Sequence, residues 1–125
     1  MVVDTSALLA LQFGEPSAAW VVEQLRHSET EPKMCTVNFT EALIRIRSVQ
    51  PTLYRQLRDD IRELVRLVPP SAEQAEIAAW ARLAYPINLG DCFAYALAKD
   101  VGEPLLTLDS DFLKTDIVVV SPPQH

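Results

Sequence analysis

Short apolar segments alternate with longer helical segments along this chain, and this alternation limits the folds that it can adopt. The apolar segments that we expect to be strands are residues 2–3, 33–36, 105–108 and 117–120. Helices are expected over residues 5–13, 16–25, 37–48, 51–62, 72–83 and 89–99. Residues 65–68 fit either a strand or the end of the preceding helix, because periodicity does not separate the two. Short strands between helices predict an α/β fold with a parallel sheet.

Helix boundaries are marked by residues that stabilise helix ends. We expect Thr36 and Asn88 to cap the starts of two helices, and Ser71 to begin a capping box with the residues that follow it. Gly102 is expected near the end of the helix over residues 89–99. These signals favour helices that begin and end close to the predicted positions.

The size and composition fit one domain over residues 1–125. Only 3 glycines are present, which excludes a glycine-rich phosphate-binding loop. Two histidines, His27 and His125, are too few for a typical zinc site and argue against a Ser-His-Asp hydrolase. No apolar run approaches the roughly 20 residues of a membrane span, and no secretory signal is recognisable. Reduced thiols are expected at Cys35 and Cys92, so we expect a cytoplasmic protein that is not in a membrane.

Four carboxylates stand out because their neighbours in the sequence are mostly apolar: Asp4, Glu41, Asp91 and Asp109. Asp4 and Asp109 follow predicted strands, whereas Glu41 and Asp91 lie in the opening turns of predicted helices. Ligand sites in open parallel sheets form at the carboxyl ends of the strands. We therefore expect the four side chains to converge at one edge of the sheet.

Acidic side chains in apolar surroundings are costly unless something compensates their charge, and few basic residues are adjacent in the sequence. A hard divalent cation, Mg²⁺ or Mn²⁺, is the natural partner of oxygen ligands. Two such ions about 3.5–4 Å apart can bind the attacking and leaving oxygens of a phosphodiester. Structural roles are the alternatives: Asp4 as a turn residue, Glu41 and Asp91 as first-turn helix acids, and Asp109 as a helix cap.

The formal net charge of −6 counts against nucleic-acid binding, but bound cations would offset it locally. Arg45 and Arg47 lie on the same predicted helix as Glu41, which makes them candidates for contacts with RNA or a protein partner. A second basic series at helical spacing is interleaved with acids, and we interpret it as a solvated face: Arg55, Arg58, Arg62 and Arg66.

Four stretches together resemble the PIN-domain ribonucleases, and most closely the VapC-type toxins of bacterial toxin–antitoxin pairs. They are Val-Asp-Thr-Ser-Ala-Leu-Leu at 3–9, Asn-Phe-Thr-Glu-Ala at 38–42, Asn-Leu-Gly-Asp-Cys-Phe-Ala-Tyr-Ala-Leu-Ala at 88–98, and Pro-Leu-Leu-Thr-Leu-Asp-Ser-Asp-Phe at 104–112. Each stretch alone is weak. All four in this order, in a chain of this length, indicate the family.

The resemblance implies a three-layer α/β/α fold with a central parallel five-stranded sheet. It implies an endoribonuclease that depends on Mg²⁺ or Mn²⁺, cuts structured RNA such as tRNA or rRNA, and forms a homodimer. A cognate VapB-type antitoxin is implied as the partner that neutralises it. Trp20 and Trp80 are candidate anchors for such protein contacts.

The resemblance also assigns residues, and two departures from the family pattern leave questions open. Asp4 and Asp91 match metal ligands, Glu41 matches a ligand or a base acting through water, and Asp109 matches the last acid. Ser6 and Thr107 match hydroxyls that orient water or a carboxylate. Some relatives carry the last acid at the position of Asp111, so the fourth ligand is either Asp109 or Asp111. Many close relatives have a glycine-rich basic loop where this chain has residues 83–87.

Two other functions compete with the nuclease. The first is a PIN-like binding protein without catalysis, although all four acids are present. The second is a phosphotransfer protein with Asp4 as the nucleophile. That chemistry would need a second acid beside Asp4 and a well-placed lysine, and the lysines are few: Lys33, Lys99 and Lys114.

Overall fold

Five parallel strands form one sheet in the computed structural model, which describes residues 1–123. Their spatial order is β3-β2-β1-β4-β5, and their bounds are β1 (Val2–Val3), β2 (Lys33–Cys35), β3 (Arg66–Val68), β4 (Leu105–Leu106) and β5 (Val119–Val120). The segment that periodicity left open is therefore a strand, and it pairs with β2. The central strand β1 pairs with β2 on one side and with β4 on the other. His125 lies outside the described residues.

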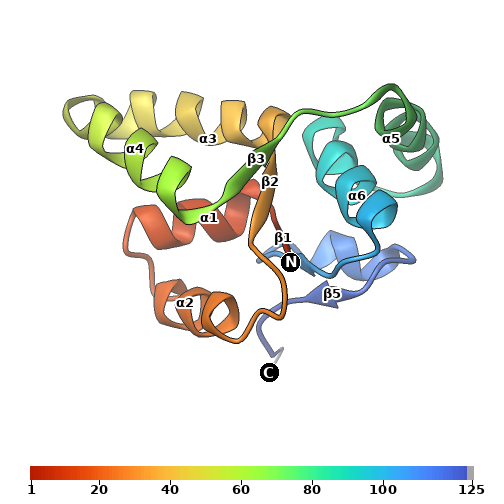
Figure 1. Cartoon of the computed structure of the whole chain (residues 1–125), viewed down its shortest axis with the longest axis horizontal. Helices are drawn as coiled ribbons and strands as arrows, with labels where there is room; N and C mark the ends of the chain where they lie inside the picture. The colour runs from red at the N-terminus through yellow and green to blue at the C-terminus, as the bar shows by residue number, and fades with distance from the viewer. Residues whose placement is uncertain (124–125) are drawn as a thin grey trace.

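Helices cover both faces of the sheet, which confirms the expected three layers (Figure 1). One face carries α1 (Thr5–Gln12), α2 (Ala18–Arg26), α3 (Thr36–Val49) and α4 (Tyr54–Leu64). The other face carries α5 (Ala72–Ala84) and α6 (Leu89–Val101), which pack closely on each other. Two short 3₁₀ helices, η1 (Pro51–Leu53) and η2 (Ser110–Lys114), complete the connections.

Alternation along each strand divides the buried side chains between the two faces. Val2 and Leu105 belong to the core beneath α5 and α6, whereas Val3 and Leu106 belong to the core beneath α1 to α4. This follows from the strand geometry, since successive side chains point to opposite faces. Both faces are covered, so β1, β4 and β5 are apolar pairs, and β2 and β3 each have two apolar residues after a basic first residue.

Most of the predicted helix ends agree with the structure. The Ser71 side chain accepts a hydrogen bond from the Gln74 N–H at 3.0 Å, and Asn88 caps α6 through the Asp91 N–H at 2.8 Å. Gly102 ends α6 in the left-handed conformation with φ 68°. The prediction for Thr36 was wrong: Cys35 is the cap position and Thr36 is already helical, because β2 runs into α3 without a turn.

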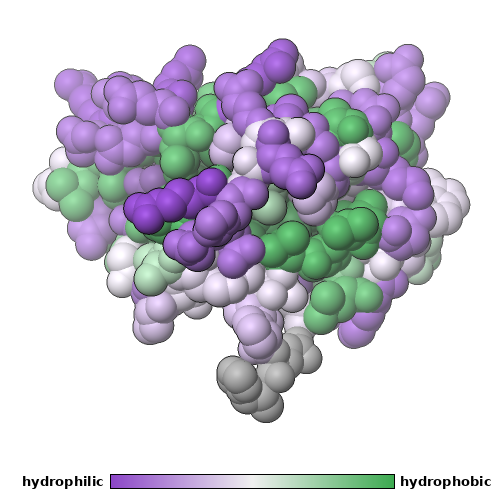
Figure 2. Space-filling view, turned by 60° about the horizontal axis from the view of Figure 1, so that its bottom comes forward, coloured by the Kyte–Doolittle hydropathy of each residue, from purple (hydrophilic) through white to green (hydrophobic). Residues whose placement is uncertain are grey.

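Apart from Ile44, Val49 and Leu53 on α3 and η1, the exposed large hydrophobic side chains of the described residues lie on one side of the molecule. Figure 2 shows them on the right half of its face, the side that α5, α6 and β5 occupy in Figure 1. The large apolar side chains most exposed on these elements and their connections are Trp80, Leu83, Leu89, Val101, Leu113 and Val118. Cys35 and Cys92 are both buried free thiols. Across residues 1–123, no helix is both long and apolar enough to cross a membrane.

Candidate active site

Asp4 lies at the carboxyl end of the central strand, where it caps helix α1. Its Oδ1 accepts hydrogen bonds from the Ser6 hydroxyl at 2.8 Å and from the Ala7 N–H at 3.0 Å. Its Oδ2 accepts a hydrogen bond from the Thr107 hydroxyl at 2.6 Å. Burial raises the pKa of Asp4 to about 6, although these three hydrogen bonds oppose the rise. Asp4 therefore does act as the turn residue considered above, and its hydrogen bonds hold the carboxylate in a buried position.

Two hydroxyls join the carboxyl end of β1 to that of β4. The Ser6 Oγ accepts a hydrogen bond from the Leu108 N–H at 3.0 Å, and the Thr107 Oγ1 accepts one from the Asp109 N–H at 2.9 Å. The two hydroxyl oxygens lie 3.3 Å apart. Ser6 and Thr107 thus orient a carboxylate, and they bring the segment that carries Asp109 next to Asp4.

Asp91 shows that the four predicted acids converge. It lies in the first turn of α6 and is half-buried, and no hydrogen bond to its carboxylate occurs among the described residues. Burial, followed by the negative charges of Asp4, Asp109 and Glu41, raises the pKa of Asp91 to about 7. Four carboxylates separated widely in the sequence therefore act on one another electrostatically at the carboxyl edge of the sheet.

Glu41 enters from the first half of α3. Its Oε1 accepts hydrogen bonds from the Thr5 hydroxyl and from the Asn38 side-chain amide, each at 2.9 Å. Thr5 can donate this hydrogen bond because it directly follows Asp4, at the same edge of the sheet. Asn38 was predicted only as part of a motif, although its position three residues before Glu41 puts both on one face of a helix.

Asp109 and Asp111 differ in where their charges act. Asp109 caps η2 through the Asp111 N–H at 2.9 Å, and its charge contributes to the raised pKa values of both Asp4 and Asp91. Asp111 instead pairs with Lys114 at 3.4 Å. The geometry therefore groups Asp109 with the other three acids and turns Asp111 toward a surface lysine.

Comparison with known proteins identifies the family. The PIN domain family matches residues 1–118. The chain belongs to the PIN-domain family. It is 39% identical to VapC ribonuclease Mb2780c of Mycobacterium bovis, over 94% of this chain and 96% of that protein. It is 38% identical to Ribonuclease VapC30 of Mycobacterium tuberculosis, over 98% of this chain and all of that protein. These relatives place the chain among the VapC ribonucleases.

Solved PIN-domain structures have the same fold. The structure of Mycobacterium tuberculosis VapC20 has a TM-score of 0.79 at 19% identity and covers 97% of this chain and 98% of its own. The toxin–antitoxin pair VapBC2 of Rickettsia felis contains a chain with a TM-score of 0.80 at 11% identity, with 98% of both chains covered. The three-layer fold predicted from the sequence is confirmed.

The PIN-domain site has the donor chemistry of a hard metal site, and the family implies a divalent ion in general. Within residues 1–123, none of the ion pairs involves any of the four acids. No three His, Cys, Asp or Glu side chains of this part come close enough to hold one ion together. The residues therefore fit a hydrated cation that one or two carboxylates ligate directly, since Mg²⁺ usually keeps several of its waters.

The two predicted arginines do not occupy equivalent places in this PIN domain. Both are exposed, but Arg45 lies four residues after Glu41 and so shares its helix face. The Arg47 guanidinium lies over the Tyr54 ring, 5.2 Å from the ring centroid, and thus points toward α4. Arg45 is the better placed of the two for a ligand at the carboxylates. In the predicted solvated series, Arg58 pairs with Asp59 at 3.0 Å, which agrees with that interpretation.

Proposed function

We propose that this VapC-type PIN domain is a Mg²⁺- or Mn²⁺-dependent endoribonuclease toxin with its site at Asp4, Glu41, Asp91 and Asp109. One observation carries the proposal: three other acids raise the pKa of Asp91, and no basic side chain pairs with any of the four in the described part. Negative charges gathered without compensation destabilise a fold at neutral pH, and a bound cation would relieve this repulsion. The family supplies a reaction that uses such a cation.

The residues of the site have different tasks in this proposal. Asp91 and Asp109 are the ligands we assign first, and Asp4 is held in place by Ser6 and Thr107. Glu41 keeps one carboxylate oxygen free of hydrogen bonds within the described residues, so it can ligate the ion or accept a proton from water. When bound, the cation supplies Lewis acidity and lowers the pKa of a water that attacks the phosphodiester. Asp111 is left as a surface residue in this assignment.

A structured RNA, such as tRNA or rRNA, is the substrate that we propose. Mycobacterium tuberculosis VapC20, which has the same fold, is described as a sarcin–ricin loop cleaving toxin. Arg45 is exposed on the Glu41 face of α3, where it can contact a phosphate beside the site. Because the chain carries a net charge of −6, local basic groups and the metal have to provide the attraction for RNA.

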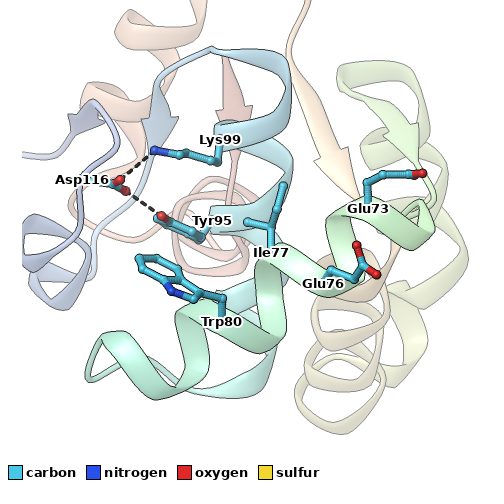
Figure 3. Close-up of a pocket in the computed structure, with 7 residues that line it drawn as sticks. All are labelled: Glu73, Glu76, Ile77, Trp80, Tyr95, Lys99 and Asp116. Atoms are coloured by element: carbon cyan, nitrogen blue, oxygen red, sulfur yellow. Dashed lines mark hydrogen bonds and ion pairs between the residues drawn. The ribbon is translucent and has the colours of Figure 1, made fainter.

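Protein partners are part of the proposal: a VapB-type antitoxin and a second copy of this chain, in the cytoplasm. Trp80 and Leu83 are 57% and 92% exposed on α5, unusual exposure for large apolar side chains. Trp80 borders a pocket of about 630 Å³ between α5 and α6, where Asp116 accepts hydrogen bonds from Tyr95 and Lys99 (Figure 3). Solved relatives of this fold include a toxin–antitoxin complex from Klebsiella pneumoniae. Trp20 is half-buried against the core beneath α1 to α4, so Trp80 is the better anchor.

No observation favours phosphotransfer through Asp4. Both oxygens of Asp4 are occupied by hydrogen bonds, and the residue is 2% exposed. The three lysines pair elsewhere: Lys33 with Glu103, Lys99 with Asp116 and Lys114 with Asp111.

Cleavage of a small-RNA pool by purified, antitoxin-free protein tests the proposed function. The reaction is run with Mg²⁺, with Mn²⁺ and with EDTA, and with Asp4→Asn and Asp91→Asn proteins whose folding is checked by circular dichroism. We expect discrete products that need the metal and disappear in both folded variants. Products that persist in the variants would point to contamination, and failure to cleave or to bind Mn²⁺ would favour the non-catalytic binding protein.

A further inference from the structure

Glu41 is held by hydrogen bonds from α1 and α3, and one of its two donors also links it to α6. The Asn38 side chain on α3 donates one hydrogen bond to Glu41 Oε1 and a second to the Gly90 carbonyl oxygen of α6, both at 2.9 Å. The Thr5 hydroxyl on α1 donates to the same Glu41 oxygen, also at 2.9 Å. One carboxylate oxygen therefore has two donors, and the other, Oε2, has none among the described contacts.

Asn38 suits its place between Glu41 and Gly90 because its side-chain amide has two N–H bonds, which no other side chain of its size has. Glu41 Oε1 and the Gly90 carbonyl are both acceptors, so the group between them has to present two N–H bonds. An aspartate at this position would place a negative charge against both acceptors. A leucine of similar shape would fill the space and donate nothing.

Gly90 makes room for the same carboxylate. A Cβ atom built at Gly90 would lie 2.1 Å from Glu41 Oε2 and 2.6 Å from Glu41 Cδ. Gly90 lies within α6 and does not have a positive φ, so its backbone does not require glycine. Alanine is the better helix former. Glu41 can therefore approach α6 this closely because residue 90 has no side chain.

The Asn38 amide is only partly satisfied in its buried position. It is 1% exposed, and its Oδ1 has no hydrogen-bond partner in the described part of the chain. A buried acceptor without a partner destabilises a fold, and an apolar group of the same shape removes that penalty. The contacts of Asn38 with Glu41 and Gly90 therefore point to a role at the site.

We infer that Asn38 is a positioning residue that, with the gap at Gly90, holds the Glu41 carboxylate in one place against α6, the helix that carries Asp91. The inference rests on the proposed function, because it assigns Glu41 to that site. A glutamate otherwise samples many rotamers, and fixing one of them in advance keeps the site ready for the cation and the substrate.

Two variants test the inference by different physical routes. Asn38→Leu removes the donors and the unpartnered acceptor, while Gly90→Ala displaces the carboxylate sterically and favours the helix. Gln74→Leu is the matched control, because Gln74 is a buried amide that donates to Asp100 at 2.9 Å far from the four acids. The measurements are thermal unfolding, Mn²⁺ affinity by calorimetry without RNA, and kcat and KM for RNA cleavage.

We expect Asn38→Leu and Gly90→Ala to unfold in one cooperative transition, as the wild type does, and to lose about 10- to 100-fold in Mn²⁺ affinity and in kcat. KM should change little, and Gln74→Leu should match the wild type in affinity and kcat. In a Glu41→Ala background, neither variant should lower kcat further. Additive losses in that background would overturn the positioning role.

The outcomes separate this inference from the proposed function. If the wild type neither binds Mn²⁺ nor cleaves RNA, the proposed function fails and the inference fails with it. If the wild type does both and the two variants behave like Gln74→Leu, only the positioning role is overturned. Should Asn38→Leu fail to fold, Gly90→Ala decides alone, since its substitution strengthens the helix.

Discussion

Two acids at opposite ends of the sheet have opposite electrostatic surroundings. Glu103 precedes β4, and although burial alone would raise its pKa, hydrogen bonds from the Met1 amino group, Thr30 and Lys33 lower it to about 2. Asp91, at the carboxyl edge, has no such partners within residues 1–123, and burial together with the neighbouring negative charges raises its pKa to about 7. The negative charge of Glu103, which links separate parts of the fold, is thus compensated by nearby cations. The charges of the acids that we assign to the site are not.

The largest effect is expected at the carboxyl edge of the sheet, where the charge of Asp91 is not compensated. Asp91→Asn should lower RNA cleavage by about 10²- to 10³-fold, because metal-assisted charge stabilisation contributes several kcal/mol to the transition state. The same change should leave the metal-free protein as stable as the wild type or more stable, since it removes a repelled charge. Single-turnover cleavage and chemical unfolding of the same preparations measure the two effects. A large loss of stability would show that Asp91 is a structural acid like Glu103.

At the amino end of the sheet, substitution of Glu103 should lower stability and leave cleavage unchanged. Glu103→Gln removes the charge shared by Lys33 and the Met1 amino group, which pair with no other acid within residues 1–123. The Glu103 side chain is 16% exposed, so we expect a loss of about 2–3 kcal/mol in the free energy of unfolding. Cleavage by the folded fraction should be unchanged. Urea unfolding with and without the substitution checks this, and a loss below about 0.5 kcal/mol would equate the pair with an ordinary surface ion pair.

The pH dependence of stability should separate the two edges. The folded-state pKa of Asp91 is raised to about 7, so the native state binds more protons than the unfolded state between about pH 4 and pH 7. The contribution of Asp91 to the stability of the metal-free protein should therefore fall as the pH rises through that window, by up to about 4 kcal/mol at about 1.36 kcal/mol per pH unit. The contribution of Glu103 is fully present above about pH 4.5 and is lost as the pH falls toward about 2.

Thermal unfolding of metal-free protein between pH 5 and pH 8 measures the contribution of Asp91. Asp91→Asn should remove the fall between about pH 6 and pH 8 and leave the smaller fall up to about pH 6 that belongs to Asp4. Saturating Mg²⁺ should reduce the whole fall, because it replaces the missing compensation. If the stability of the wild type rose steadily from pH 5 to pH 8, the four carboxylates would not be repelling one another as we propose.

Much of this arrangement could be predicted from the sequence, for identifiable reasons. The convergence of the acids follows from the rule that parallel strands present their carboxyl ends at one edge, and the caps at Ser71 and Asn88 follow from local chemistry. The choice between Asp109 and Asp111 depends on the turn of η2, which spacing does not show. The contact between Glu41 and Gly90 joins residues from different helices, so neither residue signals it locally.

The smallest effect concerns the apolar side of α5. Trp80 is half exposed and stacks edge-on against Tyr85, with ring centroids 5.6 Å apart. Trp80→Ala should weaken the complex with the antitoxin or the second copy by about 1–2 kcal/mol and leave cleavage by the free protein unchanged. Calorimetry with the antitoxin and analytical ultracentrifugation of the free chain distinguish the two partners. Unchanged affinity in both measurements would remove Trp80 as an anchor.

Calorimetric titration of the metal-free protein with Mn²⁺ at pH 7, in two buffers of different ionisation enthalpy, tests whether the four carboxylates bind a metal ion. We predict binding by the wild type with release of protons, because the pKa of Asp91 lies near 7 and a metal ligand has to be ionised. Asp91→Asn should bind much more weakly and release fewer protons. Binding by Asp91→Asn as tight as that of the wild type, or no binding by either protein, would contradict a metal site at the four carboxylates.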